Sequence, residues 1–220
     1  MNQIQQIYQT LLKEYGKQGW WPIISNKTLL CEYNGGPKND AERFEVCIGA
    51  ILTQNTSWVQ VEKALQNLAA ETIITPIGLK KLEEDVLKNA IKPAGYFNQK
   101  AKKLLLFIEF YESLEGRIPT REELLSVWGI GKETADSILL YAFNVPVFVV
   151  DAYTRRLFSV LRFIDKDAEY DDIQKMFEDA LPKDFVVYQE YHALIVEHAK
   201  RSCKTKPECL NCILKNSCKI

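Results

Sequence analysis

Apolar residues recur at helical spacing along most of the chain. From Ile4 to Tyr15 they fall three and four positions apart, which is the period of an amphipathic helix. The stretch from Phe44 to Leu52 is almost entirely apolar, which favours a helix buried at the centre of a domain. Ser57 with Gln60 predicts a capping box at the start of the next helix. The predicted helices cover about residues 4–15, 44–52, 57–68, 80–89, 101–108, 135–143 and 153–164. Because helix follows helix with no internal repeat, the pattern predicts an all-α protein.

A tight corner between two helical segments, Gly129-Ile130-Gly131, is the most specific local pattern. Glycines tolerate positive φ and leave backbone N–H groups uncovered, as a two-helix hairpin requires. The second helix would direct N–H groups and the positive end of its dipole toward an anion, so the corner can bind a phosphate. Lys132 adds a positive charge beside it, and Asn144 and Pro146 end the second helix.

Asp151 follows the apolar run 147–150 and precedes a helical pattern, so it occupies the position of a helix N-cap. A capping role alone accounts for most aspartates at such positions. The same position would also keep a carboxylate ionised, as a charged catalytic group requires. The residues by themselves leave both roles open.

Size and charge set further bounds. The 220 residues can hold one large or two small cores. The 28 basic and 29 acidic residues give a net charge of −1, which argues weakly against nucleic acid, but Lys200 to Ile220 carries six bases and one acid and offers a local basic face. The N-terminus lacks the features of a signal peptide, and no stretch reaches the ~20 apolar residues of a membrane span. These features predict a soluble cytoplasmic protein that has no membrane partner.

Four of the six cysteines lie close together near the C-terminus in a C-x5-C-x2-C-x5-C pattern. They are Cys203, Cys209, Cys212 and Cys218. Four thiolates at this spacing suit a metal centre better than disulfides, and ligand softness allows zinc or an iron–sulfur cluster. His192 and His198, which precede them, have no evident ligand partner in the sequence and are expected to be structural.

Four motifs together resemble the helix-hairpin-helix DNA glycosylases of the endonuclease III superfamily, and in particular its small bacterial 3-methyladenine glycosylase branch. They are WWP at residues 20–22, FEVCIGAILTQNT at 44–56, GYFNQKAK at 95–102, and GIGKETAD followed by VVD at 129–151. The resemblance implies two helical lobes with a DNA-binding cleft between them. A helical barrel with the hairpin would span residues 38–144, and residues 1–37 and 145–220 would form the lobe that carries the cysteines.

The same resemblance implies roles for single residues. Asp151 would be the catalytic carboxylate, and Gln54 would fill the gap left by an extruded nucleotide. Gly129, Gly131 and Lys132 would contact DNA. The cysteines would hold a [4Fe–4S] cluster, although their first spacing is one residue shorter than is usual in the family.

Substrate and reaction type follow from a further comparison with the family pattern. Glu133 stands where bifunctional members carry the lysine that attacks the sugar, so the resemblance implies a monofunctional enzyme. A base pocket formed by Trp20, Trp21, Phe44 and Glu133 would suit a cationic base such as 3-methyladenine. We therefore expect a monomer that acts on double-stranded DNA containing a damaged base. The alternatives are an endonuclease III-like enzyme for oxidised pyrimidines or mismatches, and a non-catalytic helix-hairpin-helix DNA-binding module.

Overall fold

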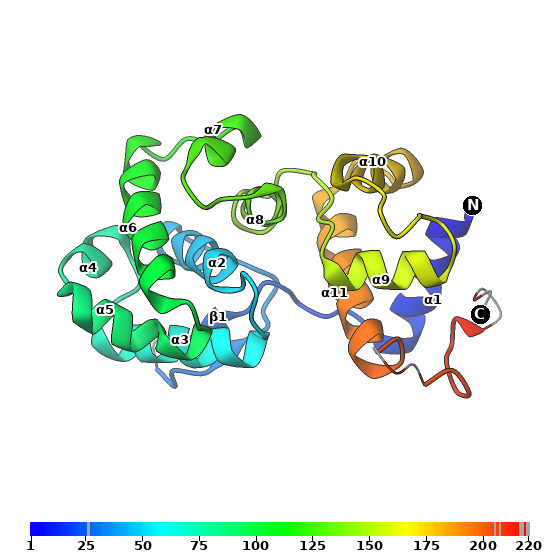
Figure 1. Cartoon of the computed structure of the whole chain (residues 1–220), viewed down its shortest axis with the longest axis horizontal. Helices are drawn as coiled ribbons and strands as arrows, with labels where there is room; N and C mark the ends of the chain where they lie inside the picture. Colours follow the sequence, from blue (N-terminus) through cyan, green and yellow to red (C-terminus); the bar gives the residue numbers. More distant parts are fainter. Residues whose placement is uncertain (26, 205, 207, 216–217, 219–220) are drawn as a thin grey trace. The chain divides into compact units, whose positions relative to one another are not determined.

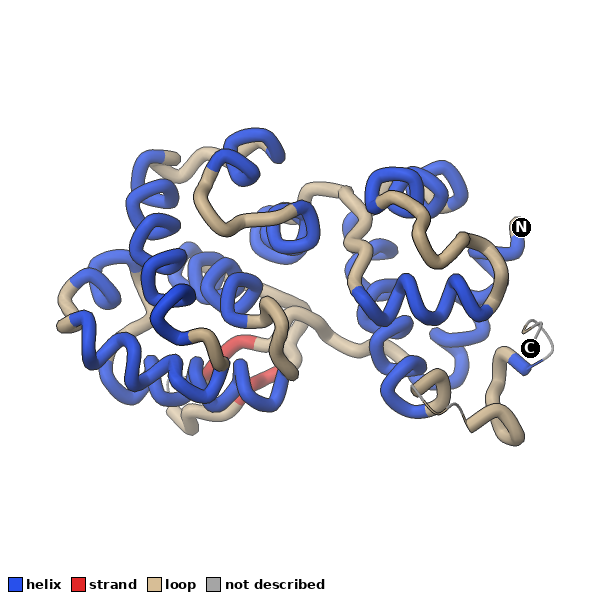
Figure 2. The backbone as a smooth tube through the Cα atoms, viewed as in Figure 1, coloured by secondary structure: helices blue, strands red, loops and turns tan. Residues whose placement is uncertain are grey.

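The computed structural model describes residues 1–25, 27–204, 206, 208–215 and 218, and within them the chain is built of helices (Figure 1). The two short strands pair with each other in one small antiparallel sheet, and helices make up the rest of the regular structure (Figure 2). The predicted all-α class is therefore confirmed. The helices that precede the predicted helix-hairpin-helix are α1 (Gln3–Tyr15), α2 (Asp40–Leu52), α3 (Trp58–Glu71), α4 (Pro76–Lys80), α5 (Glu84–Ile91), the 3-10 turn η1 (Lys92–Ala94) and α6 (Phe97–Ser113). The remainder are α7 (Arg121–Ser126), α8 (Lys132–Ser137), the π-helical segment η2 (Ile138–Ala142), α9 (Ala152–Val160), α10 (Tyr170–Ala180) and α11 (Phe185–Arg201), and the strands are β1 (Ile23–Ile24) and β2 (Cys31–Glu32).

The chain divides into two compact units. Unit 1 comprises Met1–Trp20 and Asn144–Ile220, and unit 2 comprises Trp21–Phe143. The first boundary therefore falls between residues 20 and 21, whereas the sequence placed it between 37 and 38. Trp21 explains the difference, because it is 5% exposed and packs against Trp58 and Tyr141, with ring centroids 5.3 and 5.1 Å away.

Helix α2 forms the centre of unit 2. Every residue from Phe44 to Leu52 is buried, as its apolar run predicts, and Asn39 caps the helix by accepting a hydrogen bond from the backbone N–H of Glu42. Glu45 is the charged residue on this buried stretch, and its carboxylate accepts the backbone N–H of Ile24 at 2.7 Å. Burial raises the pKa of Glu45 to about 7, although this hydrogen bond acts in the opposite direction.

Two local predictions in unit 2 are wrong. The charged helix expected at residues 80–89 is divided between α4, which ends at Lys80, and α5, which begins at Glu84. Ser57 is the N-cap of α3, but its side chain makes no capping hydrogen bond, so the expected capping box is absent. Both segments have the right composition for a helix, but the backbone breaks and caps where tertiary packing requires it.

Helix α11 is the central element of unit 1, and α1 and α9 pack against it (Figure 1). The core here is aromatic, with the rings of Phe148 and Phe177 stacked at 4.0 Å and Phe158 set edge-on to Phe177 at 4.6 Å. Tyr191 of α11 donates its hydroxyl to the backbone oxygen of Ile4, which fixes α1 on α11. In the described part of the chain, none of the helices combines the length and apolar character of a membrane span.

Candidate active site

The predicted helix-hairpin-helix is present in unit 2 as α7, a turn and α8. Gly129 has φ +84°, and a Cβ at this position would lie 2.5 Å from Cε of Lys103. Gly131, the N-cap of α8, has φ −97°, an extended conformation that any residue adopts, with open space around its Cβ position. Of the two glycines, Gly129 therefore has the positive φ that was expected of this turn. Gly131 does not, but its lack of a side chain leaves the neighbouring backbone N–H groups accessible.

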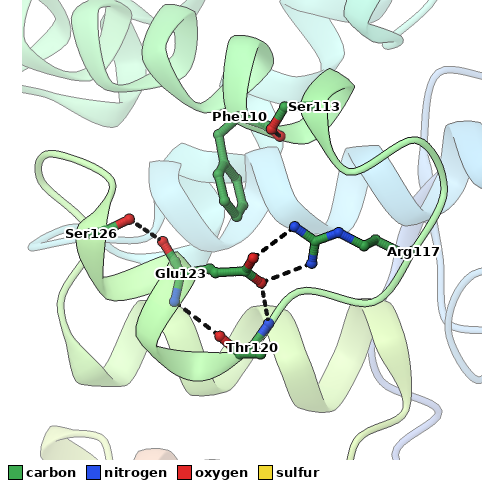
Figure 3. A network of polar contacts seen from close by, with 6 residues as sticks. All are labelled: Phe110, Ser113, Arg117, Thr120, Glu123 and Ser126. Carbon is green, nitrogen blue, oxygen red and sulfur yellow. Dashed lines mark hydrogen bonds and ion pairs between the residues drawn. The ribbon is translucent and has the colours of Figure 1, made fainter.

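The first helix of the hairpin begins in a polar network (Figure 3). Thr120 and Glu123 form a capping box, in which each side chain bonds to the other residue's backbone N–H. Arg117 donates two hydrogen bonds to the Glu123 carboxylate, at 2.7 and 2.8 Å. The bonds from Arg117 have the largest effect on the Glu123 carboxyl, and the bond from the Thr120 N–H the next largest. Together they lower the pKa of Glu123 to about 2.

A second arginine fixes the two hairpin helices to each other. Arg121, the first residue of α7, donates through Nε and Nη2 to the two carboxylate oxygens of Asp136 on α8, at 2.7 and 2.9 Å. The Asp136 side chain is completely buried, whereas a quarter of the Arg121 side chain is exposed. The carboxylate is thus the inner partner of a bidentate pair that sets the spacing of α7 and α8.

Gln54 lies against this hairpin. Its side-chain amide donates to the backbone oxygen of Gly129 and to the hydroxyl of Thr134, both at 3.0 Å, and its oxygen accepts from the ammonium of Lys103. The structure thus brings together two predicted DNA-contacting residues that lie 75 positions apart in the chain. To enter a duplex, the Gln54 side chain would first have to leave these partners.

Lys100 is a buried lysine behind the same loop. It is 2% exposed, and its ammonium donates to the backbone oxygens of Leu52 and Ala94, both at 2.8 Å. Burial, with a smaller repulsion from Lys103, lowers the pKa of Lys100 to about 8. Its position is that of a cation at the C-terminal end of α2, where it supports the loop that carries Gln54.

Asp151 of unit 1 is the N-cap of α9, as predicted. Its Oδ1 accepts the backbone N–H of Thr154 at 2.7 Å, and its Oδ2 lies 3.5 Å from Nε2 of His192. Burial raises the pKa of the Asp151 carboxyl, but the contact with His192 and the bonds from Thr154 outweigh it, so the pKa lies below its ordinary value. The carboxylate is ionised at neutral pH and retains 14% side-chain exposure.

His192 makes a contact with Asp151 that the sequence did not predict. It was expected to be structural because the sequence shows no evident ligand partner for it. In the fold, α11 carries it to the N-terminus of α9, where it lies between Asp151 and the half-buried ring of Trp20. The Trp20 and His192 rings meet edge to face, with centroids 5.8 Å apart. The sequence contained one weak signal for His192, namely its position on a largely buried helix.

The remaining residues of the predicted base pocket lie in unit 2. Phe44 is fully buried and packs against Tyr111, and Trp21 is buried in the contacts described above. Both rings belong to the core, so a base could stack on them only after local opening. Glu133 and Lys132 are exposed on the first turn of α8.

None of the four predicted cluster ligands forms a disulfide. They line one small pocket, of about 20 Å³, together with apolar residues of α9 and the loop. Among the residues that the structure describes, no three His, Cys, Asp or Glu side chains converge closely enough to hold a metal ion. The donor chemistry and the shared apolar pocket suit a cluster. His198 of α11 supports this loop, because its Nε2 lies 3.6 Å from Sγ of Cys212 and its Nδ1 is 2.9 Å from the Tyr15 hydroxyl.

One family model matches the part of the chain that carries both the hairpin and Asp151. That model, the HhH-GPD superfamily base excision DNA repair protein, covers residues 48–183. The chain belongs to this superfamily. It is accordingly a DNA glycosylase of base excision repair.

Relatives span almost the whole HhH-GPD chain. A Methanocaldococcus jannaschii protein, provisionally named a DNA repair glycosylase, is 46% identical over 98% of this chain and 95% of its own length. The endonuclease III of Thermotoga maritima is 32% identical over 84% of this chain and 87% of its own. The Helicobacter pylori 3-methyladenine DNA glycosylase bound to 1,N6-ethenoadenine superposes with a TM-score of 0.69 and 29% identity, covering 90% of this chain and 97% of that one. A non-covalent endonuclease III–DNA complex shares the fold, with a TM-score of 0.78 at 23% identity over 100% and 96% of the two chains.

Proposed function

We propose that this HhH-GPD protein is a monofunctional glycosylase. It would release an N-alkylated purine, such as 3-methyladenine, from double-stranded DNA and leave an abasic site. The observation that carries the proposal is Glu133. It lies on the first turn of α8, where the resemblance places the attacking lysine of bifunctional members. Lys132, one residue earlier, points about 100° away around the helix.

Two other lysines lie near the hairpin, and neither suits an attack on a sugar. The Lys100 ammonium has the lowered pKa of a nucleophilic amine, but it is buried and held by two backbone oxygens. The Lys103 ammonium is engaged by Gln54. An endonuclease III-like lyase remains the second candidate because a relative named endonuclease III is 32% identical over 84% of this chain.

Asp151 would act on the glycosidic bond. Base excision turns the damaged nucleotide out of the duplex, and breaking the bond gives the sugar oxocarbenium character. An ionised carboxylate stabilises that cation electrostatically and can orient the attacking water. The Thr154 N–H and His192 keep Asp151 in this charged form before substrate binds. We propose that Gln54 fills the vacated space in the stack and that Gly129, Gly131 and Lys132 contact the DNA backbone.

The substrate class follows from charge. An N-alkylated purine is cationic and its glycosidic bond is already weakened, so the enzyme needs no strong general acid. Trp20 offers a partly exposed ring in the same unit as Asp151, and a cation over an aromatic face gains about 0.5–2 kcal/mol. Glu133 would add a favourable charge. The 29% identity to a protein named 3-methyladenine glycosylase supports this choice.

The test is a panel of duplexes that each contain one lesion. We expect release of 3-methyladenine, no covalent adduct after borohydride, and loss of release in Asp151→Asn. Release of oxidised pyrimidines alone would overturn the substrate assignment, and a borohydride adduct would overturn the monofunctional one. Full release by Asp151→Asn would contradict the catalytic role, while no release of any base by the wild type would leave a DNA-binding module. Glu133→Lys adds a positive test, since an amine at a position facing the sugar should become trappable, whereas Lys132→Arg should not.

We further propose that the cysteine loop holds a [4Fe–4S] cluster. Cys203, Cys209, Cys212 and Cys218 would be its ligands. Lys200 and Arg201, at the end of α11, would then contact phosphates. Iron and sulfide analysis with the visible spectrum checks this assignment, and stoichiometric zinc without iron would refute it.

A further inference from the structure

The two oxygens of the Asp151 carboxylate have partners from different helices. Oδ1 is fixed by the N–H of Thr154 in its own helix α9, at 2.7 Å. Oδ2 faces Nε2 of His192 on α11, at 3.5 Å. A single capping bond holds one oxygen but permits the carboxylate plane to rotate, because the terminal torsion of Asp is soft. A second contact from another helix removes that freedom.

The imidazole that supplies this contact is itself held in place. Its side chain is 6% exposed. The edge of the Trp20 ring meets it at 82°. The neighbouring Tyr191 is fully buried and bonds to the backbone of α1. A ring held in this way keeps Nε2 at a fixed place beside the carboxylate, so the position of α11 helps to set the orientation of the carboxylate plane.

We propose that His192 is a positioning residue for Asp151, and that it keeps the carboxylate plane aligned for the sugar of the everted nucleotide. This inference rests on the proposed function, since it assumes that Asp151 is the catalytic group. The contact requires a proton on Nε2, so that the imidazole is the donor and the Asp151 carboxylate the acceptor.

The decisive measurement compares His192→Phe with His192→Gln. Phenylalanine fills the space but has no donor, whereas glutamine can place an N–H near the same point. We expect His192→Phe to slow single-turnover base release by about 10- to 100-fold, as loss of an orienting partner usually does. Affinity for the lesion duplex should be unchanged, and His192→Gln should recover most of the rate.

The Asp151→Asn background separates positioning from a purely structural role. If His192 acts through Asp151, adding His192→Phe to Asp151→Asn should not reduce the rate further. An equal additional loss in that background, or no recovery with glutamine, would overturn the inference. Unchanged release by His192→Phe, together with loss of release in Asp151→Asn, would overturn it and leave the proposed function intact. Full release by Asp151→Asn would instead refute the proposed function.

A measurement on the wild-type protein keeps the inference testable if the variants fail to fold. The ¹⁵N chemical shifts of the His192 ring report which nitrogen carries the proton. We expect a proton on Nε2, the nitrogen that faces Asp151. A proton on Nδ1 alone would place two lone pairs against each other and would refute the proposed contact.

Discussion

The bidentate pair between Arg121 and Asp136 gives the sharpest stability prediction. Arg121→Met keeps most of the aliphatic stem but removes the guanidinium, so the fully buried Asp136 carboxylate loses two hydrogen bonds of 2.7 and 2.9 Å. Removing one partner of a buried ion pair costs about 3–5 kcal/mol. Because a quarter of Arg121 is exposed and water can enter from that side, we expect about 3 kcal/mol. That is a large part of the ~5–15 kcal/mol of a typical domain.

Arg117 is a matched control on the adjoining segment. It makes the same bidentate contact with Glu123, but about half of the Arg117 side chain is exposed (Figure 3). Arg117→Met should therefore shift the urea midpoint far less than Arg121→Met, with circular dichroism as the probe. In Arg121→Met, a further Asp136→Asn should recover stability, because no charge then stays buried. Equal losses in the two single variants, or no recovery in the double variant, would refute burial as the source of the effect.

Three further predictions concern the hairpin, a buried acid and the cysteine loop. Gly129→Ala should destabilise the protein by about 1–2 kcal/mol, because φ is +84° and the new methyl group displaces the Lys103 stem, whereas Gly131→Ala should cost little; equal urea midpoints for the two variants would contradict this. The folded-state pKa of Glu45 is raised to about 7. The contribution of Glu45 to the free energy of unfolding is therefore complete below pH ~4.5, and about 3 kcal/mol of it is lost as the pH rises to ~7. Glu45→Gln, which still accepts the backbone N–H, should flatten that slope in unfolding curves at pH 5 and 8, and an unchanged slope would exclude Glu45 as its source. If the cysteine loop holds the proposed [4Fe–4S] cluster, His198→Phe should leave its iron content unchanged and lower its reduction potential in voltammetry, because a hydrogen bond to a ligand sulfur favours the reduced form; an unchanged potential would show that the 3.6 Å contact is not a hydrogen bond.

The sequence predicted local features well where one segment determines them. Asp151 was placed as an N-cap because an apolar run ends there and a helical period begins, and the cap bond to Thr154 is present. The buried run of α2 was predicted because every position from Phe44 to Leu52 except Glu45 is small or apolar. The capping box at Ser57 was wrong because Ser57 takes the N-cap position of α3 but its exposed side chain makes no capping hydrogen bond, and residue type alone does not determine whether that bond forms.

Features that join distant segments could not be predicted in the same way. The bonds from Gln54 to Gly129 depend on how α2 and α8 pack, which no local pattern specifies. The contact of His192 with Asp151 requires α11 to lie beside α9. The π-helical segment Ile138–Ala142 was also missed, because five buried residues in a row satisfy an α-helical period as well as a wider one.

Unit 1 is assembled from both ends of the chain, and this has a consequence for biosynthesis. Helix α1 leaves the ribosome before α11, but its apolar face of Ile4, Ile7 and Leu11 needs α11, which begins 170 residues after α1 ends. At ~5–20 residues per second, the helix waits roughly 10 to 30 s, and an isolated helix of this length is marginal in water. Unit 2 is contiguous and can fold during that delay. A nascent chain that stalls before α11 therefore exposes the apolar face of α1 without its packing partner, and chaperones and proteases recognise such exposed apolar segments.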